Sequence, residues 1–206
     1  MIRNILFDMG NVLMHWDPAL FIRRLGYTGE DALCLEREVY RSVEWVMLDR
    51  GSIEDGEAIA RIRARLPERL RPPVEDLVSH WDSEPLPMDG MLELAEALEQ
   101  AGYGLYLLTN ASRRHRVYWD KFPVSRFFPR PRIMLSADWR VIKPEAAFYE
   151  RAFSLLRLNP AECLFVDDNA ANIEAGMRLG LDGVVFFGDA AHLRRQMREK
   201  GVEVTV

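Results

Sequence analysis

The chain has 206 residues, of which 49% are hydrophobic and 29% are charged. These shares are typical of a soluble globular protein and exclude a disordered chain, and at about 150 residues per domain the length allows one domain with a sizeable insertion. The net charge of −5 excludes an overall positive field, so we expect neither a nucleic-acid partner nor binding to an anionic membrane.

The N-terminal residues predict a strand rather than a targeting segment. Residues 2–7 are a short apolar run that ends at the turn-forming cluster Asp8-Met9-Gly10-Asn11. No stretch of about 18 apolar residues follows, so we expect no signal peptide, no membrane span and a cytoplasmic location. Cys34 and Cys163 form neither a disulfide framework nor a zinc-ligand pattern, and we expect both thiols to be reduced.

From about residue 17 to residue 85 the apolar spacing is helical, without a convincing strand. Pro67, Pro72 and Pro73 separate the later helices, and Pro85 with Pro87 closes the segment, because a proline cannot continue a helix. We predict an all-helical insertion over residues 17–85, flanked by residues 1–16 and 86–206 of the main domain. Its predicted apolar faces comprise Leu35, Val39, Val43 and Val46, then Ile59, Ile62 and Leu66, and then Val74, Leu77, Val78 and Trp81.

After Pro87 the predicted helices and strands alternate. A helix with Met91, Leu94, Ala95 and Leu98 on its inner face stops at Gly102, and residues 103–108 follow as a strand. We then predict a helix near 112–121, a strand near 132–135, a helix opened by Pro144, a strand over 163–166, a helix from about 170 and a last strand-helix-strand set. This alternation predicts an α/β fold with a parallel sheet, whose ligands lie beyond the carboxyl ends of its strands.

Polar side chains follow the predicted strands at those ends. Asp8 alone is as typical of a turn as of a site, and Lys143 of a solvated loop charge. Lys143 nevertheless stands at the mouth of a helix whose dipole repels it, where it could neutralise a bound phosphate. Asp167 and Asp168 are adjacent acids that repel each other unless a cation joins them, and oxygen ligands of this kind suit Mg²⁺.

In this order and spacing, the residues at the strand ends resemble the haloacid dehalogenase superfamily, over residues 5 to about 187. The resemblance implies a Rossmann-like parallel-sheet core with an all-helical cap inserted after the first strand. The cap of that family lies between its first two motifs, where the apolar spacing predicts the insertion. The implied roles are nucleophile for Asp8, phosphate contacts for Thr109 and Asn110, phosphate-neutralising cation for Lys143, and metal acids for Asp167 and Asp168.

Longer stretches are similar to the bacterial α-D-glucose-1-phosphate phosphatase group, whose members remove phosphate from small sugars. The similar stretches are residues 7–12, 109–115, 135–138 with 143–146, and 167–174. This resemblance implies hydrolysis of a small sugar phosphate, best a sugar 1-phosphate, through an aspartyl-phosphate on Asp8. It implies Mg²⁺ held by Asp8, the Gly10 carbonyl and Asp168, with Asp167 acting through metal-bound water. We expect a monomer or a weak homodimer.

The sequence departs from the superfamily pattern at Gly10, which stands where the phosphatases carry a second aspartate as general acid and base. Such a group is worth about 10²- to 10⁴-fold in rate. A sugar 1-phosphate leaves as an anomeric hydroxyl, which is more acidic than an ordinary alcohol and needs less protonation. Alternatively His15 or Asp17 delivers the proton, although both are equally typical of a solvated loop.

The first break of the helical insertion is predicted to face the site and to select the leaving group. Glu44 is our candidate for substrate binding there, whereas Trp45 is more typical of the core of the cap. Arg113 is our candidate for a further phosphate contact, with a basic helix surface as the alternative. The predicted corner consists of Glu44, Trp45, Asp49, Arg50 and Gly51.

Two other functions stay open. In a metal-independent haloacid dehalogenase Asp8 would attack carbon, but Asp167 and Asp168 are costly beside a nucleophilic carboxylate without a cation. A non-catalytic sensor that binds a sugar phosphate is made plausible by Gly10.

Overall fold

Five parallel strands form a single sheet in the order β3-β2-β1-β4-β5. The computed structural model describes residues 1–84 and 86–204, so Pro85 in the predicted end of the insertion lies outside the described residues. The predicted α/β fold with a parallel sheet is confirmed. The strands are β1 (Asn4–Phe7), β2 (Gly104–Thr109), β3 (Ile133–Leu135), β4 (Cys163–Asp167) and β5 (Asp182–Val185).

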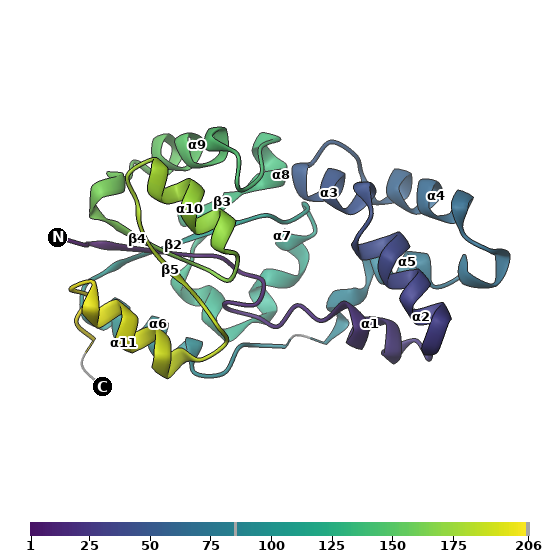
Figure 1. Cartoon of the computed structure of the whole chain (residues 1–206), viewed down its shortest axis with the longest axis horizontal. Helices are drawn as coiled ribbons and strands as arrows, with labels where there is room; N and C mark the ends of the chain where they lie inside the picture. Colours follow the sequence, from purple (N-terminus) through teal and green to yellow (C-terminus); the bar gives the residue numbers. More distant parts are fainter. Residues whose placement is uncertain (85, 205–206) are drawn as a thin grey trace.

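Helices cover both faces of the sheet (Figure 1). Successive side chains of β1 point to opposite faces, so Ile5 and Phe7 belong to one apolar cluster and Leu6 to the other. The cluster of Ile5 and Phe7 includes α6 (Met91–Gln100) and α11 (Ala190–Glu199). That of Leu6 includes α9 (Ala146–Leu156) and α10 (Ala170–Arg178). β4 is buried along its whole length, as expected of a strand covered on both faces.

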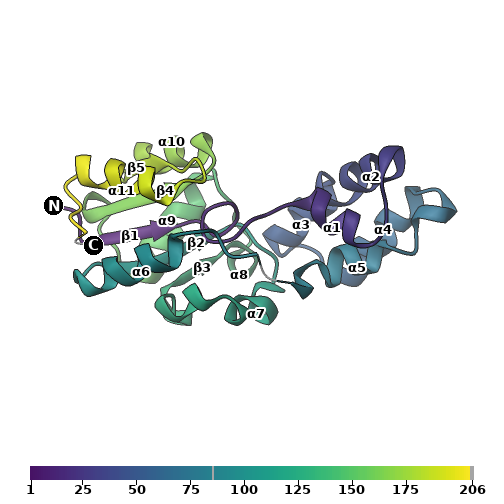
Figure 2. The ribbon, with the colours of Figure 1, turned by 90° about the horizontal axis from the view of Figure 1, so that it is seen from below.

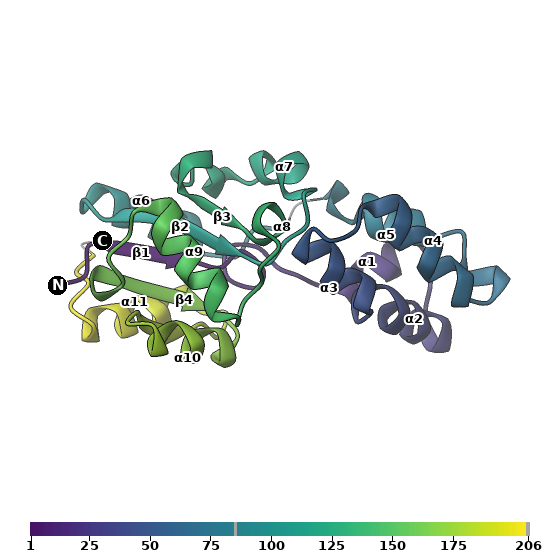
Figure 3. The same ribbon diagram turned by 90° about the horizontal axis from the view of Figure 1, so that it is seen from above.

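A group of helices lies beyond the carboxyl end of the sheet, opposite the N-terminus of the chain (Figures 2 and 3). Among the described residues of the predicted insertion 17–85 no strand occurs. We call this group, from α1 to the turn at Trp81–Ser83, the cap. Its helices are α1 (Pro18–Arg24), α2 (Gly29–Leu35), α3 (Val43–Arg50), α4 (Asp55–Arg65) and α5 (Val74–Ser79), with a π-helical turn at Glu36–Tyr40.

The chain enters and leaves the cap through two linkers that lie side by side. The His15 amide donates to the Leu86 carbonyl at 2.8 Å, and the Met88 amide donates to the Leu13 carbonyl at 3.1 Å. Because these bonds join the two linkers to each other, the chain enters and leaves the cap at one place.

Two predictions about cap and C-terminal elements are wrong. Val43 and Val46 are 64% and 47% exposed, whereas Leu35 and Val39 are fully buried. Ser42 is the reason, because its hydroxyl accepts from the Trp45 amide at 3.2 Å and starts a new helix with a different phase. The final strand is absent from the described residues up to 204, where the Glu203 amide instead donates to the Tyr103 hydroxyl at 3.1 Å.

The helix predicted near 112–121 is shorter than expected. It consists of α7 (His115–Tyr118) followed by a 3₁₀ turn at Trp119–Lys121. A further short helix, α8 (Ser136–Trp139), directly follows β3. In the described part of the chain, no helix combines the length and apolar character that a membrane crossing requires.

Candidate active site

The carboxyl ends of the central strands bring the predicted acids together. Phe7 pairs with Leu107 of β2 on one side and with Val166 of β4 on the other. The next residues along β1 and β4 are Asp8 and Asp167, so both carboxylates leave the sheet at the same level. Parallel pairing therefore places side chains about 160 positions apart in the sequence at one edge of the sheet.

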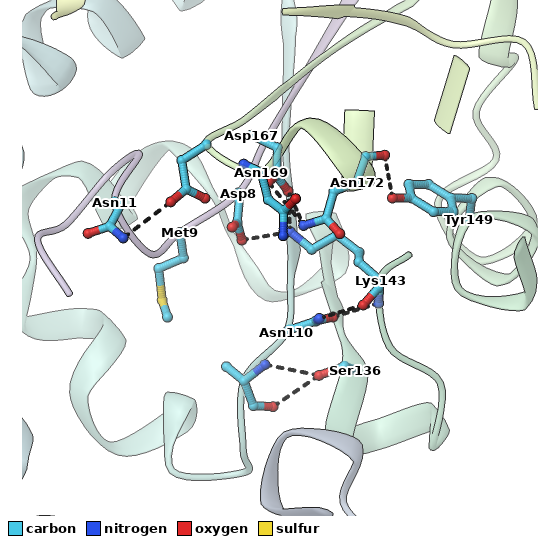
Figure 4. Close-up of polar contacts among 12 residues, drawn as sticks. Asp8, Met9, Asn11, Asn110, Ser136, Lys143, Tyr149, Asp167, Asn169 and Asn172 are labelled. Atoms are coloured by element: carbon cyan, nitrogen blue, oxygen red, sulfur yellow. Dashed lines mark hydrogen bonds and ion pairs between the residues drawn. The ribbon is translucent and has the colours of Figure 1, made fainter. Parts of the chain in front are cut away.

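Lys143 binds two of these carboxylates (Figure 4). Its ammonium nitrogen lies 2.8 Å from Asp8 Oδ1 and 2.6 Å from Asp167 Oδ2, and its side chain is 1% exposed. Burial opposes its charge, but the two carboxylates outweigh burial and raise the pKa of Lys143. The side chain of Asn110 fixes the backbone at this position. Its Nδ2 donates to the Lys143 backbone carbonyl at 3.0 Å, and its Oδ1 accepts from the Lys143 backbone amide at 2.8 Å.

Asp167 is held by hydrogen bonds on both carboxylate oxygens. Oδ1 accepts from the Asn169 amide at 2.8 Å, and the Asn172 side chain donates to both oxygens at 3.0 and 3.1 Å. The Tyr149 hydroxyl donates to the Asn172 carbonyl at 2.7 Å (Figure 4). Asn172 and Tyr149 were not predicted as site residues from the sequence. The spacing of Asn169 and Asn172 across the first turn of α10 was the available signal for Asn172.

Asp168 completes an acidic cluster with Asp8 and Asp167. One carboxylate oxygen of each of these residues lies within 4.8 Å of the others. The Asn11 side chain donates to Asp168 Oδ2 at 3.2 Å and accepts from the Trp16 amide at 3.0 Å. Burial raises the pKa of Asp168, and burial raises that of Asp8 to about 7 against the opposing effect of Lys143.

The charge of this cluster fits a divalent cation. Three carboxylates lie close to one another and two of them contact the single ammonium of Lys143, so in their ionised forms they leave an excess of negative charge in a partly buried place. Asp8 and Asp168 line the adjoining cavity together with Gly10, whereas Asp167 is fully buried. Two accessible carboxylates beside an open volume are the donor set that Mg²⁺ takes when it shares its remaining positions with water and phosphate oxygens.

The cavity above these residues lies between the sheet and the cap and has a volume of about 240 Å³. Aromatic side chains form much of its wall, which consists of Trp16, Trp45, Trp81 and Tyr118. From the described residues of the cap, Asp49 is the one charged side chain that lines it. The cavity is therefore charged at the strand ends and aromatic toward the cap.

Several predicted substrate-binding residues do not reach this cavity. Thr109 is buried at the end of β2 and is absent from the described lining. Glu44 is buried inside the cap, where its carboxylate pairs with Arg65 at 2.6 Å. Arg113 pairs with Glu54 of the cap and lines a different hollow. Lys143 is also absent from the described lining and lies directly behind Asp8, whereas Asn110 does line the cavity.

The two residues considered as proton donors also lie elsewhere. His15 is exposed, and Asp17 caps α1 by accepting from the Leu20 amide at 2.9 Å. Neither is among the described residues that line the cavity.

Trp45, predicted as core of the cap, packs against Tyr40 with ring centroids 4.8 Å apart and also reaches the cavity.

Comparison with known proteins gives consistent results. The chain is 25% identical over 193 residues to the sesquiterpene phosphatase astK of Aspergillus oryzae, with 87% of both chains covered. It is 27% identical over 119 residues to a chloroplast flavin mononucleotide hydrolase 1 of Arabidopsis thaliana, and this match spans 58% of the chain but about half of that relative, 47%.

A solved structure shares the fold. The HAD family enzyme BT-2542 of Bacteroides thetaiotaomicron, in complex with magnesium and inorganic phosphate, superposes with a TM-score of 0.69 at 22% identity, covering 94% of this chain and 99% of that one. The family of haloacid dehalogenase-like hydrolases matches residues 2–180. The chain therefore belongs to the haloacid dehalogenase-like hydrolases.

Proposed function

We propose that this hydrolase is an Mg²⁺-dependent phosphatase that acts on small phosphomonoesters through an aspartyl-phosphate on Asp8. One observation carries the proposal: buried Lys143 joins Asp167 to Asp8, which lines the cavity, and one carboxylate oxygen each of Asp8, Asp167 and Asp168 lies within 4.8 Å of the others. A nucleophilic carboxylate, a buried cation and a second accessible carboxylate are the groups that phosphoryl transfer requires, because its catalysis rests on positioning and charge stabilisation.

Each residue then has a defined task. Asp8 supplies the oxygen that attacks phosphorus, and Lys143 neutralises charge on the phosphoryl oxygens. Asp8, Asp168 and the Gly10 carbonyl would hold Mg²⁺, which when bound neutralises the same oxygens. Asp167 is a positioning residue, because both of its carboxylate oxygens are already engaged by Lys143, Asn172 and the Asn169 amide.

The names of the relatives support phosphomonoester chemistry, since one is a sesquiterpene phosphatase and another a flavin mononucleotide hydrolase. The cavity supports a smaller leaving group than either name describes. Its volume of about 240 Å³ lies just below the range of about 300–1,000 Å³ for drug-sized ligands. Aromatic walls offer flat apolar surfaces to a ring, so a sugar phosphate, in particular a sugar 1-phosphate, is our proposed substrate.

A phosphate-release assay tests the proposal. Glucose 1-phosphate, glucose 6-phosphate and p-nitrophenyl phosphate are incubated with the enzyme in Mg²⁺ and in EDTA. We expect release that requires Mg²⁺, prefers glucose 1-phosphate and falls by at least about 10⁴-fold in Asp8→Asn, because a lost nucleophile costs rates of this order. Asp120→Asn, which changes an exposed acid, is the matched control.

Other results would contradict the proposal. Turnover of 2-chloropropionate in EDTA would favour a dehalogenase, and tight binding of sugar phosphates without turnover would favour a sensor. A preference for glucose 6-phosphate would leave the phosphatase intact but overturn the sugar 1-phosphate assignment.

A further inference from the structure

The cavity lacks the usual proton donor, because Gly10 has no side chain and neither His15 nor Asp17 lines it. Apart from the two accessible carboxylates of the acidic cluster, the titratable side chains in the described lining are Asp49 and Tyr118. Tyr118 is fully buried, its hydroxyl donates to the Met9 sulfur at 3.8 Å, and burial raises its pKa well above the ordinary value. Asp49 is thus the remaining candidate.

We propose that Asp49 is the general acid and base of the reaction, reaching the leaving oxygen from the cap side of the cavity. This inference rests on the proposed phosphatase function. It assigns to the cap a catalytic task that the strand ends of this chain do not fill.

The position of Asp49 over the strand ends is fixed by contacts between cap and sheet. The Asp49 carbonyl accepts from the Ser136 hydroxyl at 2.5 Å, and the same hydroxyl accepts from the Ala111 amide at 2.9 Å. Ser136 begins α8, which lies beside the end of α3 (Figures 1 and 3). Arg50, the next residue, donates to Glu145 at 3.0 Å.

Gly51 makes this close approach possible. Its φ is +69°, and a Cβ there would lie 2.1 Å from the Ala137 carbonyl oxygen. Only a glycine lets the end of α3 touch the backbone of α8 in this way. Asp49 therefore lies on a helix end that is docked on α8, and it lines the same cavity as Asp8.

The surroundings of Asp49 favour its protonated form. It lies in the last turn of α3, where the helix dipole disfavours a negative charge. Burial raises its pKa well above the ordinary value, the negative charge of Asp8 adds to this effect, and the Ser112 amide opposes it. A carboxylic acid that keeps its proton near neutral pH can donate it to a leaving group.

The proton balance closes over one turnover. As Asp8 attacks phosphorus, the bond between phosphorus and the leaving oxygen breaks with its electron pair on that oxygen, which takes the proton of Asp49. A water molecule then attacks the aspartyl-phosphate and gives a proton to the Asp49 carboxylate. The bond from phosphorus to Asp8 breaks with its electron pair on Asp8, and inorganic phosphate and both original side chains are restored.

Leaving-group dependence tests the assignment. In Asp49→Asn we expect kcat for glucose 1-phosphate to fall by about 10²-fold or more, and kcat for p-nitrophenyl phosphate by less than about 10-fold, because an acidic leaving group needs little protonation. Equal losses on both substrates, or no loss on either, would overturn the role of Asp49 while leaving the phosphatase function standing. Wild-type enzyme without phosphate release would overturn both.

A second variant separates chemistry from folding. Gly10→Asp adds a carboxyl at another residue that lines the cavity, where a Cβ would meet only Trp16 Cβ at 3.8 Å. Combined with Asp49→Asn, it should restore glucose 1-phosphate turnover at least about 10-fold, whereas Gly10→Asn, of the same size but without an acid, should not. Equal behaviour of the two double variants would count against a missing proton donor.

Discussion

Lys143 at the strand ends and Arg65 in the cap each bind a pair of carboxylates. Lys143 lies between Asp8 and Asp167 and is almost completely buried. Arg65 contacts Glu38 at 2.7 Å and Glu44 at 2.6 Å, and about a third of its side chain (35%) is exposed. Both side chains pair one positive charge with two carboxylates, but they differ in how far water reaches them.

The difference lies in what remains unsatisfied around each cation. Arg65 donates to both oxygens of Glu44, and its bonds lower the pKa of that carboxyl, so this pair is a closed structural unit. At Lys143 a third carboxylate, Asp168, lies within 4.8 Å of Asp8 and Asp167, and a cavity opens beside it. Excess charge next to an accessible volume distinguishes a reactive cluster from a structural ion pair.

The largest expected effect comes from removing the cation of Lys143, and removal of the Arg65 cation is the comparison. Lys143→Met should abolish turnover and lower the free energy of unfolding by about 3–5 kcal/mol, because two buried carboxylates lose their partner. Arg65→Met should cost about 1–3 kcal/mol, since its surroundings are partly solvated, and should leave kcat within about twofold. Urea unfolding and initial rates measure both. A comparable loss of kcat in Arg65→Met would erase the distinction drawn between the two clusters.

A smaller effect is expected where the cap meets the sheet. Gly51→Ala should lower kcat by about 10²-fold, because the added methyl displaces the end of α3 by the order of 1 Å. Gly29→Ala is the matched control: its φ is also positive, +57°, but a Cβ there meets nothing within 4 Å. This control should lose about 1–2 kcal/mol of stability with unchanged kcat. Similar kcat values in the two variants would show that the contact of α3 with α8 is unimportant for the reaction.

The smallest effect concerns a buried base without a counter-charge. His115 is stacked on Trp119, its Nε2 has no hydrogen-bond partner among the described residues, and burial lowers its pKa to about 4. The unfolded chain binds the proton near pH 6.5 and the folded one only near pH 4, so this histidine contributes full stability above pH 6.5 and loses it as the pH falls toward 4.

Unfolding measured at pH 8 and at pH 5 should therefore differ between wild type and His115→Phe. We expect the wild type to lose about 2 kcal/mol more than the variant over this interval. Parallel losses in both proteins would show that His115 titrates normally and is accessible to water in the folded state.

The acids at the strand ends were predictable from the sequence because each comes directly after a predicted apolar strand. A polar residue that follows a parallel strand lies at the carboxyl edge of the sheet, but Asp8, Asp167 and Asp168 meet there because β1 and β4 are neighbours. Apolar spacing does not give that strand order, and the shared site was implied by the family resemblance. Lys143 precedes a helix rather than following a strand, and its role at the site was implied by the family resemblance. The register that sets its distances of 2.6 and 2.8 Å is a tertiary property.

The contacts of the cap residues could not be predicted from the sequence in this way. The predicted face of Leu35, Val39, Val43 and Val46 ran through Ser42, where the helix phase changes, so Glu44 was expected at the site and is instead bound to Arg65. Helix periodicity specifies which side is apolar but not which neighbour covers it. Asp49 was included in the corner expected to face the site, yet its relation to Gly10 follows only from how α3 docks on α8.

The hydrogen-bonded linkers make the point of insertion independent of the sequence of the cap. Leu13 and Met88 are hydrogen-bonded to each other where the chain enters and leaves the cap, so the ends of the insertion lie together whatever its sequence. A different insertion at this position would line the cavity with other side chains above the same carboxylates. The same sheet and acids would then act on a different leaving group.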